Sequence, residues 1–131
     1  MAKVPRKIIN VVEEFVRDLS KEITVDKAVI FGSYVKGEYN EESDLDVAIF
    51  SDFFEGKSRP NAITYLLLKS ISYDINIEPL AFTTKEYIER EGIVDEIIKT
   101  GVEINTNFEH SKTGITSYED NDWRYLTLIE E

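Results

Sequence analysis

The sequence predicts an α/β (α+β) fold, in which a small mixed sheet of three to four strands is flanked by helices. Short β-rich runs alternate with segments whose apolar residues recur at helical spacing. With 131 residues and 42% hydrophobic content, the chain is long enough for one domain with a real core. The short connection between the first two predicted strands permits either orientation, so we expect a mixed sheet rather than a fully parallel one.

The elements expected in the first half are a helix over 5–20, a strand over 27–31, a short helix ending near Gly37, a polar loop over 38–43 and a strand over 45–50. The first helix rests on apolar residues at helical spacing, and Pro5 fits its first turn, where a missing N–H costs little. The segment 45–50 is apolar on both faces, which indicates an interior strand covered by other elements.

The elements expected in the second half are a connection over 51–60, a helix over 61–71, a strand over 73–82, a helix starting at Thr83, a further helix with Gly101 as its C-cap and a short strand over 102–104. The strand over 73–82 rests on the alternation of Asp74, Asn76 and Glu78 with apolar neighbours, and Pro79 predicts an edge or a bend there. Thr83 and a glutamate three residues later fit a capping box.

Charge and composition narrow the classes of function. The formal net charge of −11 argues against broad binding to a nucleic-acid backbone, but it leaves room for divalent cations and for one small anionic ligand. The chain has no cysteine, no apolar run of membrane-spanning length and no secretory leader pattern, so we expect a cytoplasmic protein that does not bind membranes. Residues 1–104 are expected to form the domain, and 105–131 a polar tail that is partly ordered or binds a partner.

Two carboxylates stand at the start of the second predicted strand. Asp44 and Asp46 are two residues apart, so a strand would place them on the same face. Like charges this close repel unless a cation lies between them, and magnesium, which prefers oxygen ligands, is the expected cation. Two carboxylates also suffice for a two-metal site if one of them bridges.

A Gly-Ser pair follows the first predicted strand. Gly32 lets a ligand approach the backbone closely, and the turn that follows offers free N–H groups for a phosphate. The Ser33 hydroxyl adds a hydrogen-bond donor. If the two strands are neighbours, a phosphate site lies beside a metal site, as a nucleoside triphosphate requires. Phosphoryl chemistry needs a third carboxylate, and spacing leaves both Asp74 and Glu78 open for it.

The stretch "GSYVKGEYNEESDLD" resembles the motif of the polymerase-β-like nucleotidyltransferase superfamily, and the short length resembles its minimal nucleotidyltransferases. The resemblance covers 27–104 and implies the fold of that superfamily. It implies transfer of a nucleoside monophosphate, usually AMP from ATP, to a hydroxyl with release of pyrophosphate. The resemblance assigns Gly32 and Ser33, with Tyr34 and Lys36 as further contacts, to the nucleotide.

The same resemblance assigns Asp44 and Asp46 to magnesium and to catalysis. It places Glu78 as the third catalytic carboxylate and metal ligand, with Asp74 as the alternative. Many such proteins act as antitoxins beside a HEPN-type partner, some by adenylylating a tyrosine on it, so we expect a partner protein to supply the acceptor. A non-catalytic binding module of the same fold is the alternative function, and an acidic loop with solvated aspartates is the alternative to a site. Homo-oligomer formation stays open.

Overall fold

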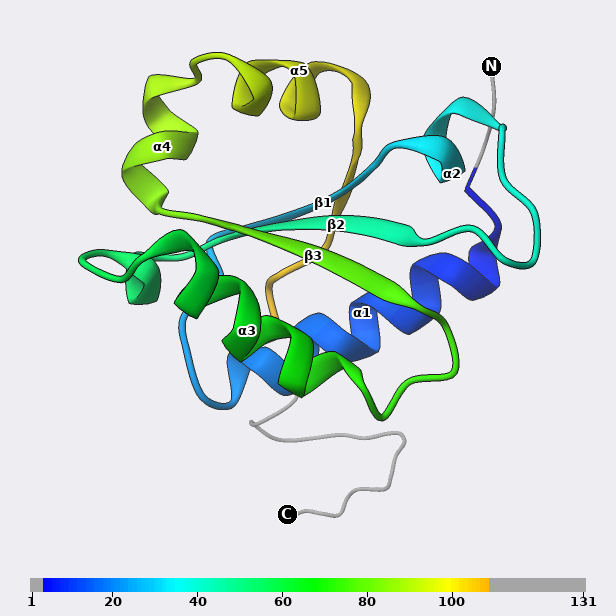
Figure 1. Cartoon of the computed structure of the whole chain (residues 1–131), viewed down its shortest axis with the longest axis horizontal. Helices are drawn as coiled ribbons and strands as arrows, with labels where there is room; N and C mark the ends of the chain where they lie inside the picture. The colour runs from blue at the N-terminus through cyan, green and yellow to red at the C-terminus, as the bar shows by residue number, and fades with distance from the viewer. Residues whose placement is uncertain (1–3, 109–131) are drawn as a thin grey trace.

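The computed structural model describes residues 4–108 (Figure 1). In chain order the elements are α1 (Arg6–Ser20), β1 (Lys27–Phe31), α2 (Ser33–Lys36), β2 (Leu45–Phe50), the 3₁₀ helix η1 (Asp52–Phe54), α3 (Arg59–Ser70), β3 (Ile77–Phe82), α4 (Thr84–Glu89), α5 (Ile93–Thr100) and β4 (Val102–Ile104). The predicted order of helices and strands is therefore confirmed, and η1 is the element that the sequence analysis did not anticipate.

The four strands form one mixed sheet in the order β3-β2-β1-β4. Strand β1 pairs antiparallel with both β2 and β4, whereas β2 and β3 run parallel. The mixed sheet is as predicted. Since β2 and β3 are parallel, both begin at the end of the sheet where β1 finishes, and the segments before them lie close together.

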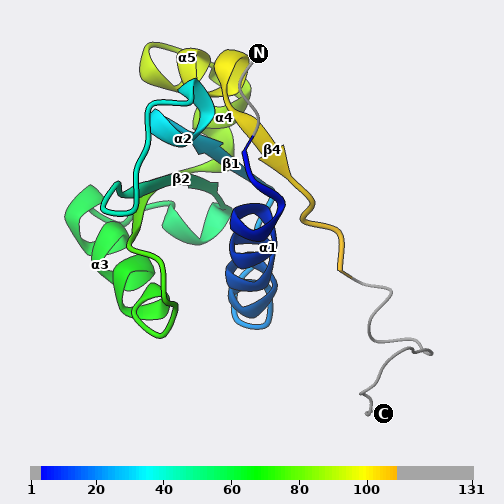
Figure 2. The same ribbon diagram turned by 90° about the vertical axis from the view of Figure 1, so that its right-hand side faces the viewer.

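The larger core lies between one face of the sheet and the pair α1 and α3, which lie side by side below the sheet (Figure 2). The residues of α1 that are buried here lie at helical spacing and are Ile8, Val12, Phe15, Val16 and Leu19. The sheet contributes Leu45, Val47 and Ile49 from alternate positions of β2. Helix α3 buries fewer residues: Leu68 on its outer side is 64% exposed, and Ile71, its C-cap, is 76% exposed.

The opposite face of the sheet carries α4 and α5 over a smaller core (Figures 1 and 2). Ala48 and Phe50 of β2 belong to this core together with Val94 and Ile97 of α5. Because alternate residues of a strand share a face, Asp46 lies on the same side as Ala48. Asp46 is half-buried, at the start of β2, whereas Ala48 and Phe50 are fully buried.

Capping residues fix the helix boundaries near β3. The predicted capping box is present: the Thr83 side chain accepts from the backbone N–H of Glu86, whose side chain accepts from the backbone N–H of Thr83. Helix α3 begins at Arg59, two residues earlier than the predicted residue 61. The cause is Ser58, whose side chain accepts from the N–H of Asn61 and caps the helix, while proline occupies the first turn.

Strand β3 begins at Ile77, so the prediction of a strand over 73–82 is wrong for its first four residues. The hydroxyl of Tyr73 donates to Asp18 on α1, which holds this segment against the helix and not in the ladder. The carbonyl of Asn76 accepts from the N–H of Leu45, and the carbonyl of Phe82 accepts from the N–H of Ser51. The backbone groups of the even-numbered residues therefore point toward β2, and those of the odd-numbered residues of β3 point toward the open edge of the sheet. Pro79 lies at such a position, as predicted, where no backbone N–H is needed.

A second odd-numbered residue of β3 is covered by a side chain. The guanidinium of Arg59 donates to the carbonyl of Ala81 and forms an ion pair of 2.9 Å with Glu86. The free edge of β3 therefore lacks one donor, at Pro79, and has one acceptor already occupied, at Ala81.

Gly101 is the C-cap of α5, as predicted, but its backbone is extended and not left-handed. A Cβ at this position would lie 2.4 Å from Val29 Cγ1 and 2.6 Å from the carbonyl of Ile97. Close packing against β1 therefore requires the glycine, and a left-handed turn does not.

The sheet ends with β4, and residues 105–108 follow it. Phe108 packs against the larger core, and the guanidinium of Arg17 lies 4.8 Å from its ring centroid. The predicted tail over 105–131 is therefore described only in these first four residues, and the rest of it lies outside the described residues. Among residues 4–108, no helix is long and apolar enough to span a membrane.

Candidate active site

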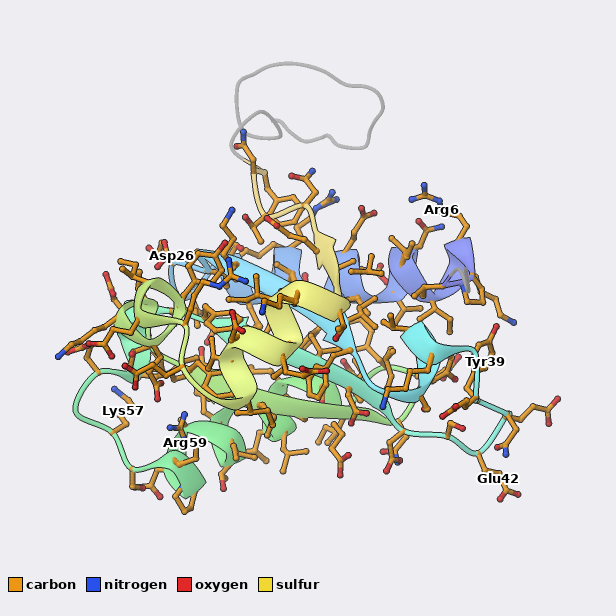
Figure 3. All side chains as sticks on the ribbon, turned by 90° about the horizontal axis from the view of Figure 1, so that it is seen from above. Arg6, Asp26, Tyr39, Glu42, Lys57 and Arg59 are labelled. Carbon is orange, nitrogen blue, oxygen red and sulfur yellow. The ribbon has the colours of Figure 1, made fainter. Side chains whose placement is uncertain are left out.

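The candidate site lies at the end of the sheet where β1 finishes and β2 and β3 begin. Asp46 is the register partner of Phe31 on β1 and of Glu78 on β3. Asp46 therefore lies on the middle one of these three strands. The Gly-Ser turn that follows β1 is on one side of it, and Glu78 of β3 is on the other. Figure 3 shows the loop that carries Tyr39 and Glu42 at this end, whereas Lys57 and Arg59 lie at the opposite end of the sheet.

Gly32 is in direct contact with the Asp46 carboxylate. A Cβ built on Gly32 would lie 2.2 Å from Asp46 Oδ2. The backbone of Gly32 also has φ 79° and ψ −147°, a conformation that residues with a side chain rarely adopt. Two independent constraints thus require glycine at this position, and one of them is the carboxylate that was predicted to bind the metal.

The turn after Gly32 is short. Helix α2 has four residues, and the Gly32 carbonyl accepts from the backbone N–H groups of its last two, Val35 and Lys36. It ends at Gly37, as predicted, where φ is 78°. One helical turn carries little dipole, so a phosphate here would depend on backbone N–H groups and on the Ser33 hydroxyl. That hydroxyl makes no hydrogen bond within residues 4–108 and is available to a ligand.

The electrostatics of the site centre on Asp46. Burial raises the pKa of Asp46 from 3.8 to about 6, and a hydrogen bond with Glu78 and the negative charges of Glu78 and Asp44 add to the increase. The two carboxyl groups on β2 and β3 therefore face each other at close range. Such a pair either holds a proton or accepts a cation, because two adjacent negative charges are costly.

Asp44 is exposed and precedes the first residue of β2. Its Oδ1 accepts a hydrogen bond from the side-chain amide of Asn76, which precedes β3. The sequence analysis placed Asn76 on the polar side of a strand but gave it no role. The alternating polar residues before β3 were the signal, yet the pairing with Asp44 depends on how β2 and β3 align.

The residues at this site fit magnesium by the chemistry of their donors. Asp44, Asp46 and Glu78 offer only carboxylate oxygens, the ligands that magnesium takes together with phosphate oxygens. Gly32 leaves the space beside Asp46 free of a side chain. Within residues 4–108, no three histidine, cysteine or acidic side chains are gathered as a ready metal cluster. Asp46 and Glu78 are the two carboxyl groups in direct contact, and Asp44 lies next to Asn76, to which it is hydrogen-bonded.

The alternative third carboxylate, Asp74, lies elsewhere. It belongs to the turn before β3 and lines a cavity of about 510 Å³ together with Tyr34, Tyr39 and Asn76. Glu78 is the register partner of Asp46, whereas Asp74 is not on the strand at all. The geometry therefore favours Glu78 over Asp74 as the partner of Asp46.

The two weaker nucleotide contacts differ in exposure. Tyr34 is buried at 6% exposure and stacks on Tyr39 with ring centroids 4.4 Å apart, so its ring contributes to packing. Lys36 is exposed at the end of α2. A nucleotide contact stays a prediction for both residues. The exposed ammonium group of Lys36 is more accessible to a nucleotide than the buried ring of Tyr34.

Known proteins resemble this chain over most of its described length. A family model described as a nucleotidyltransferase domain matches residues 9–105, which includes every candidate site residue. The curated relative "Putative protein adenylyltransferase MJ0141" of Methanocaldococcus jannaschii is 35% identical over 101 residues, which is 75% of this chain and 99% of the relative. The match thus extends over nearly the whole of that protein.

Two solved structures share the fold at low sequence identity. One is a putative nucleotidyltransferase from Sulfolobus solfataricus, with TM-score 0.55, 17% identity and coverage of 74% of this chain and 78% of that one. The other is a toxin–antitoxin crystal structure with AMP-PNP, with TM-score 0.52, 17% identity and coverage of 77% and 75%. At this identity the likeness establishes the fold of this chain and nothing finer.

Proposed function

The chain belongs to the nucleotidyltransferase domain family, and we propose that it is a magnesium-dependent adenylyltransferase that moves AMP from ATP to a hydroxyl group of a protein. The observation that carries the proposal is the contact between Gly32 and Asp46. This contact places the Gly-Ser turn, which suits phosphates, next to the Asp46 carboxylate, which suits the magnesium ion bound to those phosphates. The name of the M. jannaschii relative, "Putative protein adenylyltransferase MJ0141", supports the choice of AMP and of a protein acceptor.

Each candidate residue has a role in this proposal. Gly32 and Ser33 bind the triphosphate, with Lys36 as a further contact. Asp44 and Asp46 would hold magnesium, which when bound neutralises the charge on the phosphates and helps to align them. Glu78 would share the metal or take the proton of the acceptor, since it faces Asp46 across the β2–β3 pair.

At the α-phosphorus of ATP, the reaction forms one bond and breaks one, and a proton is transferred. The acceptor oxygen forms a bond to the α-phosphorus of ATP, and the bond from that phosphorus to the oxygen bridging to the β-phosphate breaks, so that pyrophosphate leaves. The hydroxyl proton passes to the Glu78 carboxylate and then to water. The open end of the sheet beside β2 and β3 gives an acceptor from another protein access to these groups.

The acceptor proposed is a tyrosine of a HEPN-type toxin partner, with this chain as the antitoxin. The resemblance of the motif to minimal nucleotidyltransferases supports this choice, and one neighbour in fold is itself a toxin–antitoxin structure. The cytoplasm, which supplies ATP, is the proposed compartment.

The test is transfer of label from [α-³²P]ATP to a candidate partner in the presence of magnesium. We expect labelling by the unaltered protein, none after chelation of magnesium, and none with Asp46→Asn. Asp52→Asn is the matched control, because Asp52 is an exposed aspartate at the other end of β2. Equal labelling by Asp46→Asn and the control would contradict the proposed site.

A non-catalytic binding module is the second candidate function. The exposed apolar side of α3 favours it, since Leu67, Leu68 and Ile71 are 42%, 64% and 76% exposed and lie close along the helix. A binding module predicts that the double variant Asp44→Asn with Asp46→Asn still neutralises its partner in cells, whereas an adenylyltransferase predicts that neutralisation is lost.

A further inference from the structure

Asp44 stands outside the strand ladder that fixes its neighbours. The first residue of β2 is Leu45, so Asp44 lies in the connection before it, and its side chain is exposed. An exposed carboxylate in a connection has many rotamers available, and ordering it for a ligand costs conformational entropy. A ligand that needs Asp44 in one orientation therefore needs something that holds this carboxylate.

Asn76 makes one hydrogen bond to Asp44 and one to the first residue of β2, Leu45. Its side-chain amide donates to Asp44 Oδ1, and its backbone carbonyl accepts from the N–H of Leu45 at 2.9 Å. The backbone hydrogen bond holds Asn76 in place against β2, and the side-chain hydrogen bond then restricts the orientation of the Asp44 carboxylate. An ionised carboxylate only accepts hydrogen bonds, so the NH₂ end of the amide must face Asp44.

The chemistry of an amide suits this role. A lysine or arginine at position 76 would also hold Asp44, but its positive charge would compete with a cation for the same carboxylate. An amide donates a hydrogen bond without cancelling the charge, and it occupies one of the two carboxylate oxygens while the other stays available. Carboxylates that bind metals are commonly oriented by such partners, whose loss typically weakens metal binding or activity about 10- to 100-fold.

We propose that Asn76 is a positioning residue that orients Asp44 to receive the magnesium ion of the nucleotide complex. The inference rests on the proposed function, because it assumes that Asp44 takes part in binding the cation. It predicts that the effect of Asn76 reaches the site through Asp44 alone, since Asp46 and Glu78 are held by the strands.

The experiment measures cation binding directly in the full-length protein. Mn²⁺ serves as the probe in place of magnesium, and the free Mn²⁺ signal in electron paramagnetic resonance is followed during titration in the presence of a non-hydrolysable ATP analogue. Binding to the protein is the decrease in this signal beyond that caused by the same concentration of the analogue alone. We expect the Kd for Mn²⁺ to rise about 10- to 100-fold in Asn76→Ala.

Two further variants separate orientation from structure. Asn76→Gln keeps an amide and should recover part of the loss. Asn61→Ala is the matched control, because Asn61 is exposed on α3 and its side chain makes no hydrogen bond within residues 4–108. Thermal unfolding with a chelator present should show similar stability for Asn76→Ala and Asn61→Ala.

The outcomes distinguish the two levels of the proposal. If the unaltered protein binds Mn²⁺ with the nucleotide and Asn76→Ala binds equally well, the role of Asn76 is overturned and the proposed function stands. If Asn76→Ala loses binding only in proportion to a loss of folded protein, Asn76 is structural and the inference is also overturned. If the unaltered protein binds no Mn²⁺ at all, both the inference and the proposed function fail.

Discussion

Replacement of Asp46 by asparagine is expected to stabilise the metal-free protein while it abolishes nucleotidyl transfer. The carboxylate of Asp46 contacts the backbone of Gly32 and faces Glu78, and the pKa of Asp46 is raised to about 6. The folded state therefore holds the negative charge of Asp46 less favourably than the unfolded state does. An asparagine side chain carries no charge, and its amide can donate to the Glu78 carboxylate.

The size of the effect follows from the pKa. A rise from 3.8 to about 6 corresponds to about 3 kcal/mol for a fully buried group, at about 1.4 kcal/mol for each pKa unit. Asp46 is only half-buried, and water screens much of the repulsion, so we expect about 1 kcal/mol at neutral pH. For a domain of this size, that difference raises the melting temperature by about 3 to 6 °C.

The pH dependence of stability tests separately whether Asp46→Asn stabilises the protein. Folding raises the pKa of Asp46, so the folded state binds this proton more tightly than the unfolded state does. The stability contributed by Asp46 is therefore fully present below about pH 4 and is lost as the pH rises through about 6. Asp46→Asn should exceed the unaltered protein in stability at pH 7.5, and the two should converge near pH 4.

The assay is thermal and urea unfolding at both pH values with a chelator present. The matched control is Asp52→Asn, whose stability should differ little from that of the unaltered protein at either pH. Magnesium with a non-hydrolysable ATP analogue should raise the melting temperature of the unaltered protein and of the control, but not that of Asp46→Asn. If Asp46→Asn is less stable at pH 7.5, or if its difference does not change with pH, Asp46 and Glu78 do not face each other as described.

Three other substitutions test separate parts of the site and the fold. Gly32→Ala and Gly56→Ala both place an alanine at a positive φ, 79° and 78°, but only the Cβ at position 32 meets a neighbour, so Gly32→Ala should cost about 1 to 3 kcal/mol more in urea unfolding. Equal losses would refute the contact with Asp46. Glu78→Gln should reduce transfer about 100-fold or more in the labelling assay and Asp74→Asn only slightly, whereas the reverse order would assign the third carboxylate to Asp74. Thr83→Ala removes the cap of α4 and should cost about 1 kcal/mol of stability in urea unfolding with transfer unchanged; a stability equal to that of the unaltered protein would show that the cap adds nothing.

The local sequence was sufficient for the elements that carry the site. Gly32 directly follows one predicted strand and Asp46 is the second residue of the next, so their approach required only that β1 and β2 be neighbours. Two short strands joined by a short connection are expected to pair. In the antiparallel pair that forms, Phe31 lies opposite Asp46, and Gly32 follows Phe31 directly.

Features that depend on pairing between distant segments could not be predicted in the same way. The choice between Asp74 and Glu78 depends on the register of β2 and β3, which are separated in sequence by α3. The alternation before β3 is consistent with a strand, yet the bond from Tyr73 to Asp18 places that segment in a turn. The hydrogen bond from Asn76 to Asp44 spans 32 residues of sequence and follows from the same register.

The loss of two backbone partners from the free edge of β3 limits how the proposed acceptor protein can dock. Many proteins capture a peptide by letting it join a sheet as an additional strand, which requires free backbone donors and acceptors along the edge. Pro79 removes one donor from this edge, and Arg59 occupies the acceptor at Ala81. Strand addition by a partner that approaches Glu78 from this side is therefore disfavoured, and we expect recognition through side chains. The choice of partner can therefore change by surface substitutions, while the strand that carries the carboxylate stays the same.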